Sequence, residues 1–310
     1  MSKSMTSMNS AKSADSAADV KQKVSWKEYV GISKTGIVFS NLITTFTGIW
    51  LALHFQGLTF FGQIDVVFWT LLGTAFIIAG GCALNNYVDR DIDPVMERTH
   101  ERPSATGRIS GSQMITYGLT LSALGVFFLL LTGSYAAAVF GVAGLFVYVV
   151  VYTIWLKRTH SLNTIIGGIS GALPPLIGWA AIDPNLSMIA WLLFIVMFLW
   201  QPPHFLALAM KRTDEYRKAG IPMLPVVAGF AFTKRQINTY LVALVISSFF
   251  LYPLGPVYLI VSGLLGIGWI MLGFSSHRFK DDIAWAKAMF VYSLNYLTVL
   301  FVLMVAVTLF

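Results

Sequence analysis

Charged side chains are scarce in this chain. Only 11% of its 310 residues are Asp, Glu, Lys or Arg, whereas 56% are hydrophobic. A soluble domain carries about 25% charged residues, so the shortage argues against a water-soluble protein and favours a chain that lies mostly in lipid. The formal net charge of +7 would suggest nucleic acid if the basic residues formed one patch. Their distribution indicates membrane orientation instead.

Cysteine is nearly absent as well. The single residue, Cys82, excludes an intrachain disulfide framework, and its apolar surroundings in the sequence favour a small buried side chain. Residues 1–24 have no apolar core of about 7–15 residues, so we expect no cleavable signal peptide and interpret them as a disordered cytoplasmic tail. In 25–34 aromatic and aliphatic residues alternate with charged ones, which predicts a short interfacial helix. We expect residues 25–310 to form one transmembrane domain.

Long apolar runs make up most of the remaining sequence. Each has about 20 residues, the length of a helix that crosses a bilayer, so the sequence predicts an all-α, polytopic bundle of nine transmembrane helices. The expected spans are 36–55, 66–87, 113–132, 136–156, 162–181, 187–209, 235–253, 256–275 and 285–308.

Basic residues are missing from every second loop. The loops after the first, third, fifth and seventh predicted spans contain no Lys or Arg, and all 21 of these residues lie on the other side of the bundle. Because cytoplasmic loops carry the excess of Lys and Arg, the pattern places the N-terminus in the cytoplasm and the C-terminus outside the cell membrane. A falsely assigned span in the middle of the chain would have scrambled it.

Three oxygen-bearing side chains repeat at intervals of four where the second span ends: Asn85, Asp89 and Asp93. This spacing predicts that they share one helical face. Two carboxylates and an amide oxygen in one stripe are typical of a site for a hard cation such as Mg²⁺. Pro94 disfavours helix at the residue before it, so we expect the helix to end near Asp93, at the membrane boundary. A solvated loop that only anchors topology is the alternative.

Basic residues follow the acidic ones on the same side of the membrane. Arg98 and Arg102, four residues apart, look contradictory beside carboxylates unless a ligand carries further negative charge. A polyphosphate bound through Mg²⁺ would use both kinds of side chain. Further candidates, for which topology anchoring is an equally good interpretation, lie in the loops after the fourth and sixth spans: Lys157, Arg158, Lys211, Arg212 and Asp214.

Paired prolines lie inside two predicted spans, at 174–175 and 202–203. Proline frees backbone carbonyls, which a span tolerates where it lines a pocket, so we expect broken helices around a central cavity. His204 directly follows the second pair and is a site candidate, with a hydrogen-bonded structural histidine as the alternative. Trp179 and Trp200 could flank a cation in the cavity, although packing in the core explains them equally well.

These residues resemble a known motif. The pattern Asn85-x-x-x-Asp89-x-x-x-Asp93, followed by Arg98-Thr99-x-x-Arg102-Pro103 and Gly107, looks like the first motif of the UbiA superfamily of intramembrane prenyltransferases. The resemblance covers nearly the whole chain from about residue 25, in motif order and span count. It implies a nine-helix bundle whose central cavity opens toward the cytoplasm and binds a prenyl diphosphate through Mg²⁺.

One departure from the usual motifs of the superfamily indicates a particular branch of it. Most members carry a second aspartate-rich motif after the sixth span, whereas here that loop keeps only Asp214 and Glu215 among basic residues. Together with Asn86, Pro202–Phe205 and Met223–Val226, this is similar to the branch of protohaem IX farnesyltransferases. That likeness implies farnesyl diphosphate and haem B as substrates, with haem O and diphosphate as products, and Mg²⁺ as cofactor.

The resemblance also implies roles for the candidate residues. Asp89 and Asp93 would hold Mg²⁺ with support from Asn85, and the basic candidates would clamp the diphosphate. His204 would ligate the haem iron or orient a propionate or a water. The expected partners are membrane lipid and a haem A-forming enzyme or oxidase assembly factors, with no nucleic acid.

Three other functions stay open. A related prenyltransferase with an aromatic quinone-precursor acceptor predicts a fuller second aspartate motif than this chain has. A secondary transporter predicts paired repeats and ligands near the midplane of the membrane, whereas the acidic residues here cluster at one boundary. A haem-delivery protein would need neither Mg²⁺ nor three aligned oxygen ligands.

Overall fold

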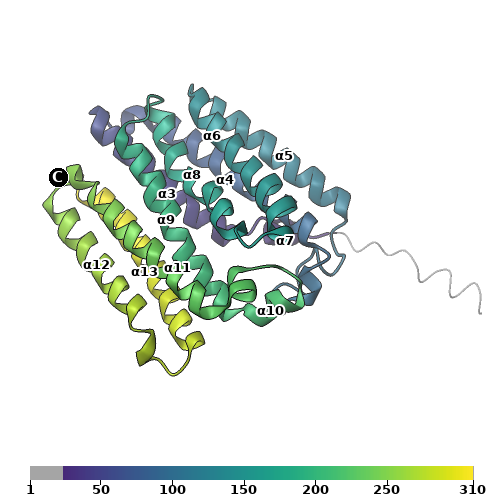
Figure 1. Cartoon of the computed structure of the whole chain (residues 1–310). Helices are drawn as coiled ribbons and strands as arrows, with labels where there is room; N and C mark the ends of the chain where they lie inside the picture. The colour runs from purple at the N-terminus through teal and green to yellow at the C-terminus, as the bar shows by residue number, and fades with distance from the viewer. Residues whose placement is uncertain (1–23, 310) are drawn as a thin grey trace, which may run out of the picture.

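The computed structural model describes residues 24–309, and every regular element in that range is helical (Figure 1). The predicted all-α fold is therefore confirmed. The predicted tail lies outside the described residues apart from Val24. The long helices are α3 (Thr35–Gln56), α4 (Ile64–Asp89), α5 (Gly111–Leu130), α6 (Tyr135–Phe146), α8 (Asn163–Ile182), α9 (Met188–Lys211), α11 (Leu224–Phe249), α12 (Pro256–Phe274) and α13 (Asp282–Ala306).

Shorter elements connect or extend these helices. α6 continues into a π-helix, η3 (Val147–Leu156), and then into α7 (Lys157–Thr159), so three elements make one crossing. The short elements elsewhere are α2 (Trp26–Ile32), α10 (Thr213–Lys218) and the single 3-10 turns η1 (Phe61–Gln63), η2 (Asp93–Val95), η4 (Tyr252–Leu254) and η5 (Ser276–Arg278).

Eight segments between residues 24 and 309 are long and apolar enough to cross a membrane. They coincide with eight of the nine predicted spans. The other predicted span, 235–253, falls in α11, whose middle is polar because it contains Lys234 and Arg235. α11 also has a kink at Gly229, where φ is 73°. The count of nine transmembrane helices therefore stays a prediction.

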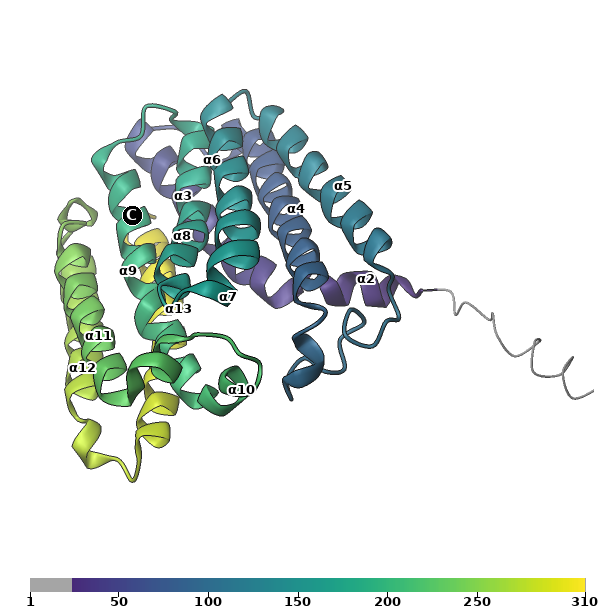
Figure 2. The same ribbon diagram turned by 45° about the vertical axis from the view of Figure 1, so that its right-hand side comes forward.

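The helix predicted after the tail is present as α2. Ser25 and Glu28 form a capping box at its start, in which each side chain binds the other residue's backbone N–H. Ile32 is buried, whereas the Trp26 side chain is exposed. α2 lies crosswise under the lower end of α4 (Figure 2). Its position at a membrane surface stays a prediction.

Glycine allows two of the central helices to approach closely. A Cβ atom at Gly48 of α3 would lie 2.0 Å from the carbonyl oxygen of Pro175 in α8, and one at Gly178 of α8 would lie 2.1 Å from that of Thr45 in α3. Small residues at such crossings let backbones pack directly in membrane bundles. The close approach at Gly48 and Gly178 fixes the wall that α3 and α8 share.

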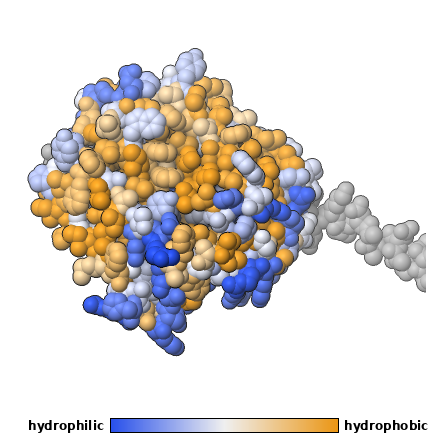
Figure 3. Space-filling view, in the orientation of Figure 1, coloured by the Kyte–Doolittle hydropathy of each residue, from blue (hydrophilic) through white to orange (hydrophobic). Residues whose placement is uncertain are grey.

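The polar ends of the bundle are unequal. The loops that carry basic residues, namely those around α2, α7, α10 and η5, lie at the lower end in Figures 1 and 2. Figure 3 shows hydrophilic residues gathered along this edge and hydrophobic residues over the middle of the molecule. Ion pairs join separate elements there, including Arg108 with Glu28 at 3.3 Å and Lys234 with Asp282 at 2.8 Å.

Candidate active site

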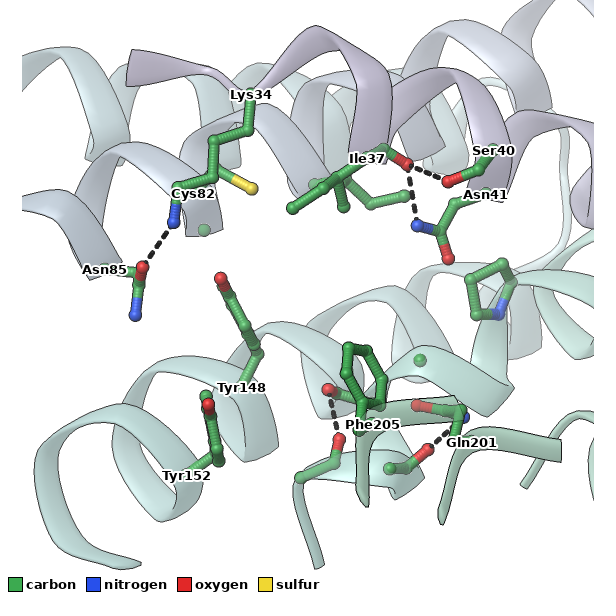
Figure 4. A pocket seen from close by; sticks show the side chains of 18 of the residues that line it. Lys34, Ile37, Ser40, Asn41, Cys82, Asn85, Tyr148, Tyr152, Gln201 and Phe205 are labelled. Carbon is green, nitrogen blue, oxygen red and sulfur yellow. Dashed lines mark hydrogen bonds between the residues drawn. The ribbon is translucent and has the colours of Figure 1, made fainter. Parts of the chain in front are cut away.

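A cavity of about 480 Å³ lies among α3, α4, the η3 crossing, α8, α9 and α13 (Figure 4). One end is polar, and small or apolar residues form most of the remaining wall. Six of the predicted catalytic, metal-binding and substrate-binding residues line it: Asn85, Asp89, Asp93, Arg102, Lys157 and His204.

The acidic motif does not form one continuous helical stripe. α4 ends at Asp89, one turn earlier than predicted, and Asp93 begins the 3-10 turn η2. The helix ends early because Pro94 cannot continue it and starts a new turn instead. The Oγ1 of Thr99 donates a hydrogen bond to the Asp93 carbonyl oxygen at 2.9 Å, which holds this turn. The fold-back returns Asp93 to the cavity that Asp89 also lines.

Two buried carboxylates at the polar end each have one cationic partner. Asp89 and Asp93 are both 2% exposed. Lys157 Nζ lies 2.5 Å from Asp89 Oδ2, and Arg102 Nη1 lies 3.0 and 3.1 Å from the two oxygens of Asp93. A buried charge without a partner costs several kcal/mol, so these pairs make the burial of both acids possible. Within residues 24–309, Asp89 Oδ1 has no hydrogen-bond partner, which leaves it able to bind a cation.

Lys34 completes the polar end, and sequence reasoning missed it as a site residue. It precedes α3 with a φ of 50°, a left-handed conformation that is uncommon for lysine. Its Nζ donates to Asn85 Oδ1 at 2.6 Å (Figure 4). Burial lowers the pKa of Lys34 to about 8. The only indication in the sequence is that Lys34 lies directly before the first span, and a role in membrane orientation explains that position equally well.

The π-helix brings the fourth crossing into register with the acidic motif. Its hydrogen bonds run from i to i+5, so residues five apart lie above one another. Tyr148 therefore aligns with Thr153, and Tyr152 with Lys157. Tyr148, Tyr152 and Lys157 line the cavity, and Figure 4 shows the Tyr148 hydroxyl pointing toward Asn85. Hydropathy alone gave no signal for this segment, because α and π geometry bury similar apolar residues.

Thr153 sets the orientation of the Asn85 amide. Thr153 Oγ1 donates to the Tyr148 carbonyl oxygen at 2.8 Å and accepts from Asn85 Nδ2 at 3.1 Å. The hydroxyl has one proton, and that proton is committed to the carbonyl, so the amide nitrogen of Asn85 must face Thr153. The amide oxygen therefore faces Lys34 and the cavity.

Five of the predicted binding residues do not line the cavity: Arg98, Arg158, Lys211, Arg212 and Asp214. Arg158 binds both oxygens of Asp91, at 2.6 and 2.7 Å, and this contact lowers the pKa of Asp91 to about 2. Asp214 pairs with Arg217 at an exposed position, and Arg212 pairs with Glu215. Lys211 Nζ lies 5.9 Å from the Phe290 ring centre, and Arg98 is exposed.

The proline pairs do not break their helices. α8 and α9 both continue through them, so the prediction of broken helices is wrong. Gln201 of α9 links the two helices near the prolines, because its Nε2 donates to the carbonyl oxygens of Gly168 on α8, at 2.8 Å, and of Met197, at 3.2 Å. The cavity nevertheless lies beside both pairs, since Pro174 and Gln201 line it.

His204 lies in the cavity wall within a ring of aromatic residues. Its Nδ1 is 2.7 Å from Ser293 Oγ on α13, and its ring stacks on Trp200 at 4.5 Å and on Phe290 at 4.8 Å between ring centres. Trp200 also lines the cavity, whereas Trp179 is fully buried in the core and its Nε1 donates to Asp183 at 3.4 Å. Of the two tryptophans singled out in the sequence, only Trp200 therefore reaches the cavity.

The sequence matches the model of a known protein family. A family model described as the UbiA prenyltransferase family matches residues 41–295. The chain belongs to this family. Its long apolar helices and this membership make it an integral membrane protein.

Two UbiA relatives are similar over almost their whole length. Protoheme IX farnesyltransferase of Alkalihalophilus pseudofirmus is 62% identical over 292 residues, which cover 94% of this chain and 93% of the relative. The protein of the same name in Bacillus thuringiensis is 58% identical over 278 residues, covering 89% of this chain and 90% of the relative.

Solved structures of the UbiA family have the same fold. A digeranylgeranylglyceryl phosphate synthase superposes with a TM-score of 0.75 at 18% identity, covering 91% of this chain and 98% of the other. A UbiA homologue from Archaeoglobus fulgidus bound to GPP and Mg²⁺ superposes with a TM-score of 0.63 at 14% identity, covering 89% and 99%. At these identities the likeness shows the fold alone.

Proposed function

We propose that this chain transfers the farnesyl group of farnesyl diphosphate to a vinyl group of haem B. The vinyl carbon attacks C1 of the farnesyl chain, the bond from C1 to diphosphate breaks, and water adds to the resulting cation with loss of a proton. The products are haem O and diphosphate. The names of the two relatives support the acceptor, and the polar end of the cavity supports the diphosphate.

The charge of the polar end is the observation that carries this proposal. Lys34, Arg102 and Lys157 supply three positive charges, and Asp89 and Asp93 supply two negative ones, so one positive charge remains. An ionised prenyl diphosphate with one Mg²⁺ carries one net negative charge. Its binding would therefore neutralise a buried site, which is the condition under which buried ions are least costly.

The residues present fit a magnesium ion that is shared with a substrate. Between residues 24 and 309 no group of three or more His, Cys, Asp or Glu could hold a metal ion. Mg²⁺ often binds one or two carboxylates together with substrate phosphates and waters, and the unpartnered Asp89 Oδ1 offers such a contact. Asp89, Asp93 and Asn85 would hold it. When bound, it would supply Lewis-acid stabilisation of the departing diphosphate.

Other side chains of the cavity would bind the phosphate groups and stabilise the positive charge on the farnesyl chain. Lys34, Arg102 and Lys157 would move from the motif oxygens to phosphate oxygens, where charge-assisted hydrogen bonds follow the growing negative charge. The stacked rings of Tyr148 and Tyr152, 5.9 Å apart, would face the allylic carbon as positive charge develops on it. Five predicted residues lie outside the cavity and would act only at its entrance: Arg98, Arg158, Lys211, Arg212 and Asp214.

The same proposal orients the protein. The polar end of the cavity would face the cytoplasm, with the N-terminus inside and the C-terminus outside the cell membrane, since the loops that carry basic residues lie at that end. Residues 25–310 would act as one domain. Haem O would then pass to a haem A-forming enzyme or an oxidase assembly factor.

A direct assay tests the function. The purified protein in detergent or lipid is incubated with haem B, farnesyl diphosphate and Mg²⁺, and the haem product is examined by mass spectrometry. We expect a haem heavier by one farnesyl group and one hydroxyl group. A parallel reaction replaces haem B with 4-hydroxybenzoate. Prenylation of that acceptor without modification of haem would reject the proposal in favour of an aromatic-acceptor enzyme.

Chelation of divalent metal should abolish turnover and leave the fold intact. Each buried acid already has a cationic partner, so the empty site is not destabilised by repulsion between carboxylates. We expect EDTA to lower farnesyl transfer to background, while the midpoint of thermal unfolding changes by no more than about 2 °C. Activity should return when Mg²⁺ is added. A large fall in the midpoint would show that the acids depend on metal for folding.

Replacing Thr153 with valine should weaken metal binding through Asn85. Valine keeps the shape but removes the acceptor that holds the Asn85 amide nitrogen. We expect Mn²⁺ affinity, measured by electron paramagnetic resonance with an unreactive farnesyl thiodiphosphate, to fall about 10- to 100-fold. Thr153→Ser keeps the hydroxyl and should behave like wild type. Because a carboxylate presents oxygen on both sides, Asn85→Asp should abolish the effect of Thr153→Val, and additive losses would contradict the assigned orientation.

A further inference from the structure

Gln201 places a buried amide in the cavity wall, away from the acidic motif. It lies on α9 directly before the second proline pair, and the residue is 4% exposed. It lines the cavity, and Figure 4 shows its amide there. Its hydrogen bonds within residues 24–309 go to α8 and α9 and reach none of the proposed metal or diphosphate ligands. The polar end of the cavity therefore does not account for it.

The amide of Gln201 is held in one orientation. Its Nε2 donates to the carbonyl oxygens of Gly168, at 2.8 Å, and of Met197, at 3.2 Å. Because an amide nitrogen has two protons and both are committed to acceptors, Oε1 must be the atom on the other side. No donor among residues 24–309 binds Oε1. A buried acceptor in this position is normally satisfied by a water or a ligand.

A glycine on α8 leaves room for the amide oxygen. A Cβ atom at Gly171 would lie 2.4 Å from Gln201 Oε1, so any side chain there would collide with the oxygen. A Cβ atom at Gly168 would lie 3.6 Å from the same oxygen, which is an ordinary contact. Gly171 also lines the cavity. The position of Oε1 in the wall therefore depends on Gly171 having no side chain.

The first proline pair adds further acceptors next to Oε1. Pro174 and Pro175 have no N–H, so the carbonyl oxygens of Ser170 and Gly171, four residues earlier, lack their usual helical donors. Ser170 and Gly171 line the cavity beside Gln201. This part of the wall offers acceptors and no donor. A water molecule can donate two hydrogen bonds to such a group, and its lone pairs then face the interior of the cavity.

We propose that Gln201 positions the water that adds to the cation formed by farnesyl transfer. This inference rests on the proposed function, because that reaction forms the cation. Bonding of the outer vinyl carbon to the farnesyl chain leaves positive charge on the inner carbon, next to the porphyrin. The water oxygen bonds to that carbon, and one water proton passes to solvent, which gives the hydroxyl group of haem O. A neutral amide accepts a hydrogen bond without taking up the proton, so Gln201 is a positioning residue.

The alternative fate of the cation supplies the test. If no water is held beside it, the cation loses a proton from the adjacent carbon and becomes an alkene, lighter than haem O by one water. Gln201→Met keeps the length of the side chain and removes the amide. In reactions of the purified full-length protein with haem B, farnesyl diphosphate and Mg²⁺, we expect this variant to lower the ratio of hydroxylated to alkene product about tenfold or more. Mass spectrometry measures both products, and a merely structural loss would lower them equally.

Two glycine variants keep the test independent of the folding of Gln201→Met. Gly171→Ala leaves Gln201 in place but displaces its oxygen, so the product ratio should fall as it does in Gln201→Met. Gly168→Ala is the matched control on the same helix and should keep the wild-type ratio. An unchanged ratio in Gly171→Ala, or an equal fall in Gly168→Ala, would overturn the inference even if wild type makes haem O. If wild type does not farnesylate haem at all, the proposed function fails and this inference fails with it.

Discussion

Asp89→Asn is expected to lower kcat/KM for farnesyl transfer about 10³-fold or more. The substitution keeps the size of the side chain and removes the charge that would hold Mg²⁺ at the diphosphate. Loss of one preorganised electrostatic contact in a buried site costs about 10²–10³ in rate, and here a metal contact goes with it. The measurement is the rate of haem O formation at several Mg²⁺ concentrations, so that weaker metal binding and slower chemistry can be told apart.

Asp91 provides a matched control two residues away. It is exposed, pairs with Arg158 and does not line the cavity. Asp91→Asn should therefore keep activity within about threefold of wild type, since surface ion pairs contribute little. Equal losses in the two variants would mean that general acidity of this loop matters, and the metal assignment of Asp89 would be abandoned. An active Asp93→Ala variant would lead to the same conclusion for the second carboxylate.

Lys157→Met is expected to destabilise the folded protein as well as inactivate it. Among residues 24–309, Lys157 is the partner of Asp89, whose side chain is 2% exposed. Removing one member of a buried pair leaves an uncompensated charge, which costs about 3–5 kcal/mol in the free energy of unfolding. The midpoint of thermal unfolding in detergent should fall accordingly. Arg158→Gln, at the adjacent and more exposed pair, is the control and should change it little.

A double substitution distinguishes the structural and chemical roles of Lys157. Lys157→Met combined with Asp89→Asn removes both charges of this buried pair, so most of the lost stability should return. Farnesyl transfer should stay at background, because both the metal contact and the phosphate contact are gone. Recovery of activity together with stability would mean that this pair serves only the fold.

Much of the architecture could be predicted because a membrane-spanning helix appears in the sequence as an apolar run of about 20 residues. Eight of the predicted spans agree with the structure to within a few residues. The span at 235–253 is not among these eight, since polar residues such as Lys234 and Arg235 interrupt the middle of α11. The all-α class needed only the length and hydropathy of these runs.

The site was less predictable because it depends on where helices end and how they wind. The spacing of Asn85, Asp89 and Asp93 identified the right residues, but through a continuous helix that the chain does not form. Lys34 and Thr153 reach the motif through contacts 51 and 68 residues away in the chain. Such contacts follow from packing, and one sequence contains no signal for them. The π geometry that aligns Thr153 is equally invisible to hydropathy.

The pairing of each motif side chain with a cation makes metal and substrate depend on each other. Mg²⁺ arriving alone could reach Asp89 Oδ1, but contact with Asp89 Oδ2 or Asp93 would displace Lys157 or Arg102 and leave that cation buried without a partner. Diphosphate arriving alone would meet two carboxylates. Together they give every charge an opposite, so each ligand raises the affinity for the other by the same factor. The site should therefore bind Mg²⁺ and the diphosphate together much more tightly than it binds either one alone. A divalent ion without diphosphate, or a phosphate without the metal, should leave it largely empty.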